Sequence, residues 1–212
     1  MITGARYDKR DFSEWPDLQT LKKKIAPALL PTTKYVFENE LLNSLIGRWL
    51  LQGLLEKKEV SLQKLHLRSD DHGKPLLSLP FDFSIAHSFD VVICLVSDEG
   101  SIGVDVEKIR DVPLEEYRSS FTEREWSFIM KAHNKIESFF SLWTKKESLL
   151  KMHGLGLQIP LTQVKVLDTV GVITAMPSIH KGVWHPYGIP GYCCHIAVPE
   201  NASSFEIDTV EF

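Results

Sequence analysis

Hydrophobic residues recur three and four positions apart along residues 38–56, with polar residues between them. This spacing predicts a helix with one face in the core. A second long helix is predicted at about residues 136–153, with a stop at Gly154, because glycine readily adopts the left-handed backbone that ends a helix. Before it, Thr122 and Glu125 have the spacing of a capping box, which predicts the start of a shorter helix.

Shorter apolar runs, separated by Gly, Pro and Asp, predict strands. The first four along the chain are residues 62–67, 81–86, 91–96 and 102–106, which we expect to pair antiparallel. In the second half they are residues 164–167, 170–175, 182–187, 192–198 and 205–210. The fold class predicted is α+β, a pseudo-twofold arrangement of two similar halves, each a small antiparallel sheet packed with a long helix. The halves are residues 1–100 and 101–212, and the second carries the candidate metal site at their interface.

Composition narrows the functional classes. The chain has 212 residues, 43% of them hydrophobic, which is enough for a sizeable core. A net charge of -4 leaves no basic stripe for nucleic acid. The start of the chain lacks an apolar signal core, and the longest apolar run, 91–96, is too short to span a bilayer, so we expect a soluble, cytoplasmic protein. Three cysteines without a Cys-x-x-Cys spacing indicate buried thiols rather than a zinc site.

Candidate chemistry lies in two segments. Asp105 and Glu107 end a predicted strand and, being two residues apart, project from the same face. Glu147 and Lys151 are four residues apart in the second long helix and therefore neighbours on its surface. Together the three carboxylates and the lysine can hold a magnesium ion beside a phosphate.

Each pair alone has an ordinary explanation. An Asp-x-Glu at a strand end is usually a solvated edge, and a Glu and Lys at helical spacing usually form a surface pair. Trp143 favours a functional role, because a large apolar side chain one turn before Glu147 indicates that this face of the helix points inward. A partly buried Glu147 close to two other acids would need a cation.

Five motifs occur in a fixed order: Gly73-Lys74-Pro75, Ile85-Ala86-His87-Ser88, Ile102-Gly103-Val104-Asp105-Val106-Glu107, Phe121-Thr122-Glu123-Arg124-Glu125, and the segment 143–151. In this order the sequence closely resembles the 4'-phosphopantetheinyl transferases of the long, surfactin-activating type. The resemblance covers roughly residues 5–198 and is strongest over 73–157. It implies a monomer of two similar α+β halves.

The resemblance also implies a reaction. The 4'-phosphopantetheine arm of coenzyme A moves to a serine hydroxyl of an apo acyl or peptidyl carrier protein, as in secondary metabolism, and adenosine 3',5'-bisphosphate is released. Asp105, Glu107 and Glu147 would bind Mg²⁺, with Mn²⁺ as an alternative. Glu147 would take the serine proton, directly or through a metal-held water, and Lys151 would steady the pyrophosphate.

By the same resemblance, coenzyme A meets further residues. His87 would contact one of its phosphates, Lys74 and Pro75 would line the adenine and ribose end, and Ala86 and Ser88 would flank it through their backbone. Asp105 and Lys151 complete the predicted coenzyme A site. The carrier protein is expected to dock near residues 121–126.

Some positions depart from the family pattern. An arginine that helps to hold the 3'-phosphate of coenzyme A falls on Asn43, and we expect weaker or differently placed recognition of that phosphate, with Lys34 or Arg48 as candidate substitutes. A serine beside the histidine is replaced by Ala86, and a lysine between two glycines by Leu155. These departures leave the carboxylate set unchanged.

Two other functional classes are compatible with some of these residues. A magnesium-dependent nucleotide pyrophosphohydrolase would use the same acids with water as the nucleophile, which would leave Lys74 and His87 without a role. A non-catalytic module that binds coenzyme A or a carrier protein is expected to have lost Asp105, Glu147 or Lys151, and all three are present.

Overall fold

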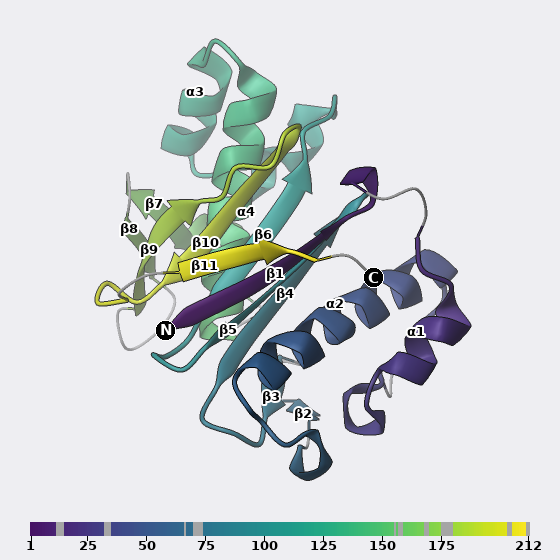
Figure 1. Cartoon of the computed structure of the whole chain (residues 1–212). Coiled ribbons are helices and arrows are strands. Elements are labelled where there is room, and N and C mark those ends of the chain that lie inside the picture. Colours follow the sequence, from purple (N-terminus) through teal and green to yellow (C-terminus); the bar gives the residue numbers. More distant parts are fainter. Residues whose placement is uncertain are drawn as a thin grey trace.

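The computed structural model describes residues 1–11, 15–31, 35–65, 67–69, 74–154, 156, 159–167, 170–174, 180–202 and 205–210. The fold is mixed α+β, as predicted (Figure 1). The helices are α1 (Leu18–Lys24), α2 (Glu38–Lys57), α3 (Glu123–Lys131) and α4 (Lys135–His153). The strands are β1 (Ile2–Asp8), β2 (Leu67–Ser69), β3 (Pro75–Leu77), β4 (Asp82–Ser88), β5 (Val91–Ser97), β6 (Gly103–Lys108), β7 (Val164–Leu167), β8 (Val170–Ile173), β9 (His180–Pro186), β10 (Tyr192–Val198) and β11 (Phe205–Thr209).

Two larger sheets organise the chain. The first has the strand order β11-β1-β5-β4 and the second β6-β10-β9-β8-β7, while β2 and β3 form a separate hairpin. Pairing is antiparallel except between β1 and β11, which run parallel. Strand β11 thus follows the whole second half in sequence but joins the sheet of the first.

Most predicted elements are confirmed, including both long helices, the cap of α4 at Gly154 and the capping box of Thr122 and Glu125. The strand predicted at 62–67 is wrong: Leu62–Lys64 form a 3-10 turn, and only Leu67 enters β2. The strand predicted at residues 102–106 pairs antiparallel, as expected, but its partner is β10 of the second sheet rather than one of the preceding strands. Residue 175, the end of another predicted strand, lies outside the described residues.

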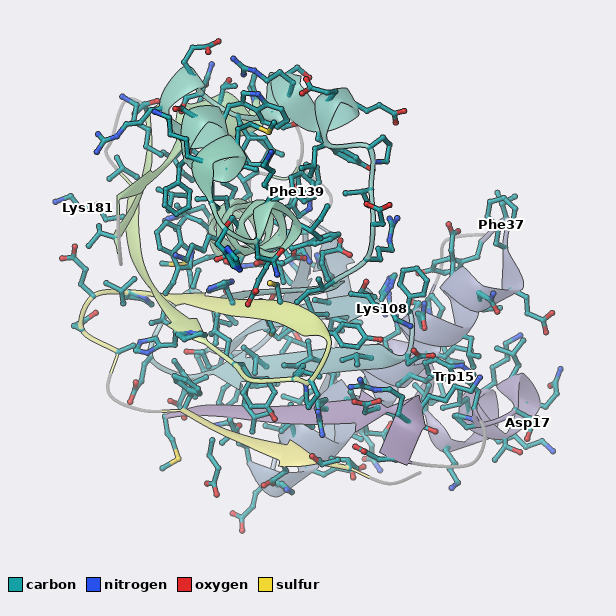
Figure 2. The ribbon with its side chains drawn as sticks, turned by 90° about the horizontal axis from the view of Figure 1, so that it is seen from above. Trp15, Asp17, Phe37, Lys108, Phe139 and Lys181 are labelled. Carbon is teal, nitrogen blue, oxygen red and sulfur yellow. The ribbon has the colours of Figure 1, made fainter. Side chains whose placement is uncertain are left out.

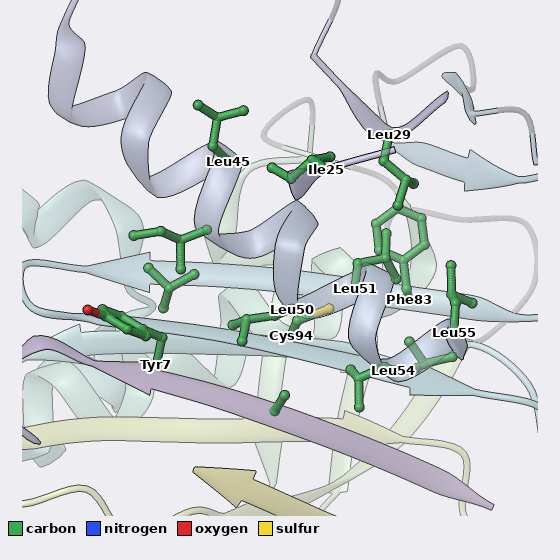
Figure 3. Close-up of a cluster of buried hydrophobic side chains, with 14 of the residues drawn as sticks. Tyr7, Ile25, Leu29, Leu45, Leu50, Leu51, Leu54, Leu55, Phe83 and Cys94 are labelled. Carbon is green, nitrogen blue, oxygen red and sulfur yellow. The ribbon is translucent and has the colours of Figure 1, made fainter. Parts of the chain in front are cut away.

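Buried side chains separate the molecule into layers. One cluster lies between α2 and the first sheet and includes Tyr7, Leu50 and Cys94 (Figure 3). A second cluster fills the space between the two sheets, and a third lies between the second sheet and α4. The sheets therefore pack against each other, and α2 and α4 cover their outer faces (Figure 1). Within the described ranges, every helix is too short or too polar to cross a membrane.

Edge strands β4 and β6 join the two sheets without a backbone ladder. Side chains of β4 accept hydrogen bonds from backbone N–H groups of β6 and the residue before it: Asp82 from Ile102 (2.9 Å), Ser84 from Val104 (3.0 Å) and Ser88 from Lys108 (3.1 Å). The acceptors alternate along β4 because every second residue of a strand projects from the same face. Ala86, at the remaining position of this series, has no hydroxyl and is buried between the sheets. These bonds place His87 and Ser88 beside the strand that carries Asp105 and Glu107.

Candidate active site

Gly103 allows α4 to lie directly on β6. A Cβ at this position would stand 1.9 Å from the carbonyl oxygen of Ser148 and 2.5 Å from the backbone nitrogen of Met152. No side chain fits between helix and strand at such a distance. The close approach brings Lys151 over Asp105, which is two residues further along the same face of β6.

Asp105 and Lys151 form the direct contact between β6 and α4. Lys151 Nζ donates to Asp105 Oδ1 at 2.7 Å, and only 8% of the Asp105 side chain is exposed. Burial raises the pKa of Asp105, although the lysine cation opposes this effect. Burial alone would lower the pKa of Lys151, but Asp105, Glu147 and Glu107 together raise it. The lysine thus remains a cation among three acids.

Glu107 lies beside the β4 edge. Ser88 Oγ donates to Glu107 Oε2 at 2.8 Å and accepts a hydrogen bond from the N–H of Lys108. The hydroxyl therefore holds both the Glu107 side chain and the backbone of β6. Burial raises the pKa of Glu107, and the charge of Asp105 raises it further. The predicted coenzyme A residue Ser88 therefore contacts the carboxylate set through its side chain.

The carboxyl group of Glu147 has a pKa well above its ordinary value. Burial, followed by the charge of Asp105 and then that of Glu107, raises its pKa to about 7, against the opposing effect of Lys151. Its Oε1 atom is buried and has no hydrogen-bond partner among the described residues. A carboxyl that titrates near neutral pH is well matched to accept a proton in a reaction. Trp143 packs against Phe121, Phe139 and Tyr117, consistent with the inward-facing helix surface predicted from the sequence.

The donor set fits a hard divalent cation. Asp105 Oδ2 and Glu147 Oε1 are both buried carboxylate oxygens without a hydrogen-bond partner among the described residues. Mg²⁺ is commonly held by one or two carboxylates, with the remaining positions filled by water and substrate phosphates. As the side chains stand in the described part of the chain, no three His, Cys, Asp or Glu residues are close enough to form a metal site by themselves. Asp105, Glu107 and Glu147 are thus not gathered into one three-ligand group, and Glu107 is bonded to Ser88.

A buried lysine fixes the orientation of α4. Lys146 is fully buried, and its Nζ donates to Glu125 Oε2 and to the carbonyl of Leu161, both at 2.8 Å. The same Glu125 oxygen accepts the N–H of Thr122 in the capping box of α3. Burying a cation is costly unless it is paired and hydrogen-bonded, as here. Sequence reasoning assigned no role to Lys146, although the residue stands within the motif that contains Glu147.

His195 is a second residue that the sequence did not indicate. It lies directly opposite Asp105 in the β6–β10 ladder, and its Nδ1 is 2.8 Å from Thr144 Oγ1 on α4. Because the Thr144 hydroxyl donates to the carbonyl of Phe140 at 2.8 Å, it accepts from His195, which places the ring proton on Nδ1. Burial lowers the pKa of His195 to about 4, so the ring is neutral at physiological pH. The sequence does not indicate this contact, because Thr144 and His195 lie far apart in the chain and no local spacing marks the pair.

His87 stands at the edge of the set nearest α2. Gly47 allows α2 to approach β4, since a Cβ there would lie 2.6 Å from Ile85. One turn earlier, Asn43 Nδ2 lies 3.4 Å from His87 Nδ1. Partial shielding of the ring from water lowers the pKa of His87, the charge of Lys151 lowers it further, and Glu40 opposes both.

Arg48, one of the two candidate substitutes for the missing arginine, is hydrogen-bonded to other groups. Arg48 donates to the carbonyl of Leu29 at 2.8 Å and to Ser44 Oγ at 3.4 Å. Lys34 lies outside the described residues. On the described part of α2, the side chains beside His87 are therefore the neutral Asn43 and the acidic Glu40.

The other predicted coenzyme A residues are Lys74, Pro75 and Ala86. Lys74 Nζ forms an ion pair with Asp82 at 2.8 Å and a longer bond to the carbonyl of Met152 at 3.4 Å, at the end of α4. Pro75 begins β3, and Ala86 is buried between the sheets. Gly73 and Leu155, which were part of the motif interpretation, lie outside the described residues.

A cavity of about 1210 Å³ opens between α3, α4 and β10. It is lined in part by Thr122, Arg124 and Glu125 of the predicted docking segment 121–126, and by Phe128 and His195. Among the described residues that line it, none is Asp105, Glu107, Glu147 or Lys151. The carboxylate set thus lies on the β4–β6 side of α4, and this cavity on another.

Comparison with known proteins shows the family to which the chain belongs. The 4'-phosphopantetheinyl transferase superfamily matches residues 101–189. The 4'-phosphopantetheinyl transferase Sfp of Bacillus subtilis is 31% identical over 159 residues, which are 70% of this chain and 70% of that protein. The 4'-phosphopantetheinyl transferase gsp of Aneurinibacillus migulanus is 32% identical over 60% of this chain and 55% of its own length. The chain belongs to the 4'-phosphopantetheinyl transferase superfamily, as its motifs indicated.

The matched part spans only about half of some relatives. L-aminoadipate-semialdehyde dehydrogenase-phosphopantetheinyl transferase of Xenopus laevis is 27% identical over 62% of this chain and 49% of that protein. Among solved structures, holo-[acyl-carrier-protein] synthase of Thermotoga maritima matches 46% of this chain and 61% of its own, at 17% identity and a TM-score of 0.34. The fold assignment above rests on the chain's own sheets and helices.

Proposed function

We propose that this protein transfers the 4'-phosphopantetheine arm of coenzyme A to a serine of an apo acyl or peptidyl carrier protein. The observation that carries the proposal is the convergence of Asp105, Glu147 and Lys151 at the contact of β6 and α4, where two carboxylate oxygens have no partner among the described residues. Family membership supports the reaction class. In the reaction the serine oxygen forms a bond to the phosphorus that bears pantetheine, and the bond from that phosphorus to adenosine 3',5'-bisphosphate breaks.

Each residue of the site has a proposed role that follows from its chemistry. Glu147, with its pKa near 7, accepts the serine proton as the new bond forms. Lys151 is a point charge that stabilises the pyrophosphate and the departing phosphate. Asp105 orients Lys151 through their 2.7 Å bond. When bound, a divalent ion would neutralise the pyrophosphate oxygens. Asp105 and Glu147 would hold it through their free oxygens, and Glu107 would join them on release from Ser88.

The substrate is proposed to lie between two halves, residues 1–100 and 101–212, related by an approximate twofold axis. Apart from β11, which joins the first sheet, each half contributes a sheet covered by one long helix, α2 or α4, and this supports the arrangement. His87 and Ser88 from the first half would then face coenzyme A from one side, with Lys74 and Pro75 at its adenine and ribose end. Carrier docking at residues 121–126 is supported by the neighbouring cavity.

The test of this function is chromatographic detection of adenosine 3',5'-bisphosphate with coenzyme A and magnesium, with and without apo carrier protein. Release that requires the carrier supports the transferase. Release without carrier indicates a pyrophosphohydrolase instead, and coenzyme A binding without release under either condition indicates a non-catalytic module.

We predict that the metal-free protein loses stability as pH rises from about 4.5 to about 7. Burial raises the pKa of Glu147 from 4.5 to about 7, so the folded state binds the proton more tightly than the unfolded chain. The stabilising contribution of protonated Glu147 is complete below pH 4.5 and lost as pH rises through 7. Added Mg²⁺ is therefore expected to raise the melting temperature at pH 8 and to have little effect at pH 5.

Thermal unfolding of chelator-treated protein across this range, with and without Mg²⁺, checks the prediction. The Glu147→Gln variant is the control, because it removes the titrating group and should flatten the profile. An equal effect of Mg²⁺ at both pH values would contradict the metal assignment.

We predict little discrimination between coenzyme A and dephospho-coenzyme A. On the described part of α2, the surface beside His87 offers Asn43 and Glu40 rather than a cation, so a 3'-phosphate gains little there. The variant Asn43→Arg should increase the preference for coenzyme A by about tenfold or more, since a charge-assisted bond to phosphate is among the stronger hydrogen bonds. Asn43→Gln is the matched control. Steady-state kcat/KM for both substrates is the measurement, and strong wild-type preference for coenzyme A would contradict this account.

A further inference from the structure

The hairpin between β4 and β5 contains a strained aromatic residue. Ser88 pairs with Val91, so the loop consists of Phe89 and Asp90 alone. Phe89 has a φ of 50°, in the left-handed region. Two-residue hairpin loops favour Gly, Asn or Asp at such positions, because the Cβ of a bulky residue crowds the backbone there. The turn geometry therefore does not explain why this position is a phenylalanine.

Burial does not explain the phenylalanine either, because its side chain is 56% exposed. The loop is nevertheless held firmly. The Asp90 carbonyl accepts from the Lys9 N–H at 2.9 Å, and the Asp90 N–H donates to the Tyr192 hydroxyl at 3.2 Å. The Asp90 carboxylate is 3.1 Å from Lys108 Nζ. The hairpin therefore presents an exposed ring on a fixed support.

Two cations flank this ring. Lys108 Nζ lies 4.8 Å and Arg110 Cζ 5.7 Å from its centroid. We call Phe89, Lys108 and Arg110 the hairpin patch. It borders the carboxylate set, because Lys108 follows Glu107 on β6 and Ser88, next to Phe89, bonds Glu107. Figure 2 shows Lys108 between the part of the molecule that contains α4 and the helices of the first half.

We propose that the hairpin patch is a docking contact for the apo carrier protein, an inference that rests on the proposed function. A serine that reaches Glu147 belongs to a macromolecule, and the surface around that serine must lie against the rim of the site. The patch offers an apolar ring between positive charges, which complements an apolar side chain flanked by carboxylates. Exposed aromatic and arginine side chains supply much of the affinity of protein interfaces, and a rigid support lowers the entropy lost on binding. Strained backbone is also concentrated at functional sites.

The variant Phe89→Gly separates docking from folding, because glycine adopts the observed φ without strain. Its melting temperature is expected to equal or exceed that of the wild type, and its affinity for coenzyme A to be unchanged. The dissociation constant for a carrier protein whose acceptor serine is replaced by alanine should rise by about tenfold or more. Phe89→Trp, which keeps an aromatic ring, should retain most of the affinity.

Isothermal titration with one acyl and one peptidyl carrier protein, each with the serine replaced by alanine, is the binding measurement, beside transfer to the unmodified carriers. Unchanged carrier affinity in Phe89→Gly overturns the proposal, as does an equal loss of coenzyme A affinity, which would assign the ring to the nucleotide site. If the wild-type protein binds carriers but transfers nothing, the proposed reaction is refuted. The docking contact is then still tested by comparing the carrier affinities of the wild type and Phe89→Gly. A wild-type protein that binds neither carrier overturns the docking proposal.

Discussion

Glu147→Gln is expected to reduce transfer of phosphopantetheine by at least about 100-fold, the usual contribution of a positioned general base. The amide has the size of the carboxyl group but cannot accept the serine proton. The same change removes a negative charge from the neighbourhood of Asp105 and Glu107, both of which raise the pKa of Glu147 by repulsion. The variant should therefore be at least as stable as the wild type at pH 8.

Lower activity with equal or higher stability distinguishes a functional carboxyl group, whether it acts as a base or as a metal ligand, from one that only stabilises the fold. Initial rates of transfer and thermal unfolding at pH 8 measure the two quantities. Glu116→Gln, at an exposed carboxyl on the segment Leu114–Ser120, is the matched control and should change neither. Activity within a few-fold of the wild type in Glu147→Gln would exclude it as the base.

Gly103→Ala is expected to destabilise the fold by about 3 kcal/mol or more, as overpacking of a closely packed contact does. The added Cβ would stand 1.9 Å from the Ser148 carbonyl oxygen and 2.5 Å from the Met152 nitrogen, and since both of these are backbone atoms, neither can rotate away. Relief requires α4 to move from β6, which would separate Lys151 from Asp105. Transfer is therefore expected to be lost even at temperatures where the variant remains folded.

Gly53→Ala is the control for this substitution. Gly53 lies within α2, and a Cβ there meets nothing within 4 Å. Alanine in a helix interior is favoured over glycine by about 0.5 to 1 kcal/mol, so this variant should gain stability. Chemical denaturation of both variants gives the comparison, and a Gly103→Ala protein as stable as the wild type would refute the close approach of α4 to β6.

The elements that the sequence predicted well are those with a long or regular local pattern. Helices α2 and α4 have apolar residues at helical spacing and a clear start or stop, and both were found. The pattern at residues 62–67 predicts a strand where the structure has a 3-10 turn at Leu62–Lys64, because a few apolar residues fit either structure. The partner of β6 could not be read from order along the chain, since that partner is β10, which lies far away in the sequence.

The same distinction applies to the site. Asp105, Glu107, Glu147 and Lys151 were identified because two local spacings, on a strand and on a helix, each placed a pair on one face. The contact of His195 with Thr144 and that of Phe89 with Lys108 join residues from different elements, and no local spacing marks them. Ser88 was expected to act through its backbone, but its side chain bonds Glu107 because β4 and β6 lie edge to edge.

Intact-protein mass spectrometry of an apo carrier protein incubated with this protein, coenzyme A and magnesium tests the central claim most directly. The account predicts a gain of one phosphopantetheine group on the wild-type carrier, none on a carrier whose serine is replaced by alanine, and little with the Glu147→Gln or Lys151→Ala enzyme. No gain on several acyl and peptidyl carriers, under conditions where coenzyme A is bound, would contradict the transferase assignment.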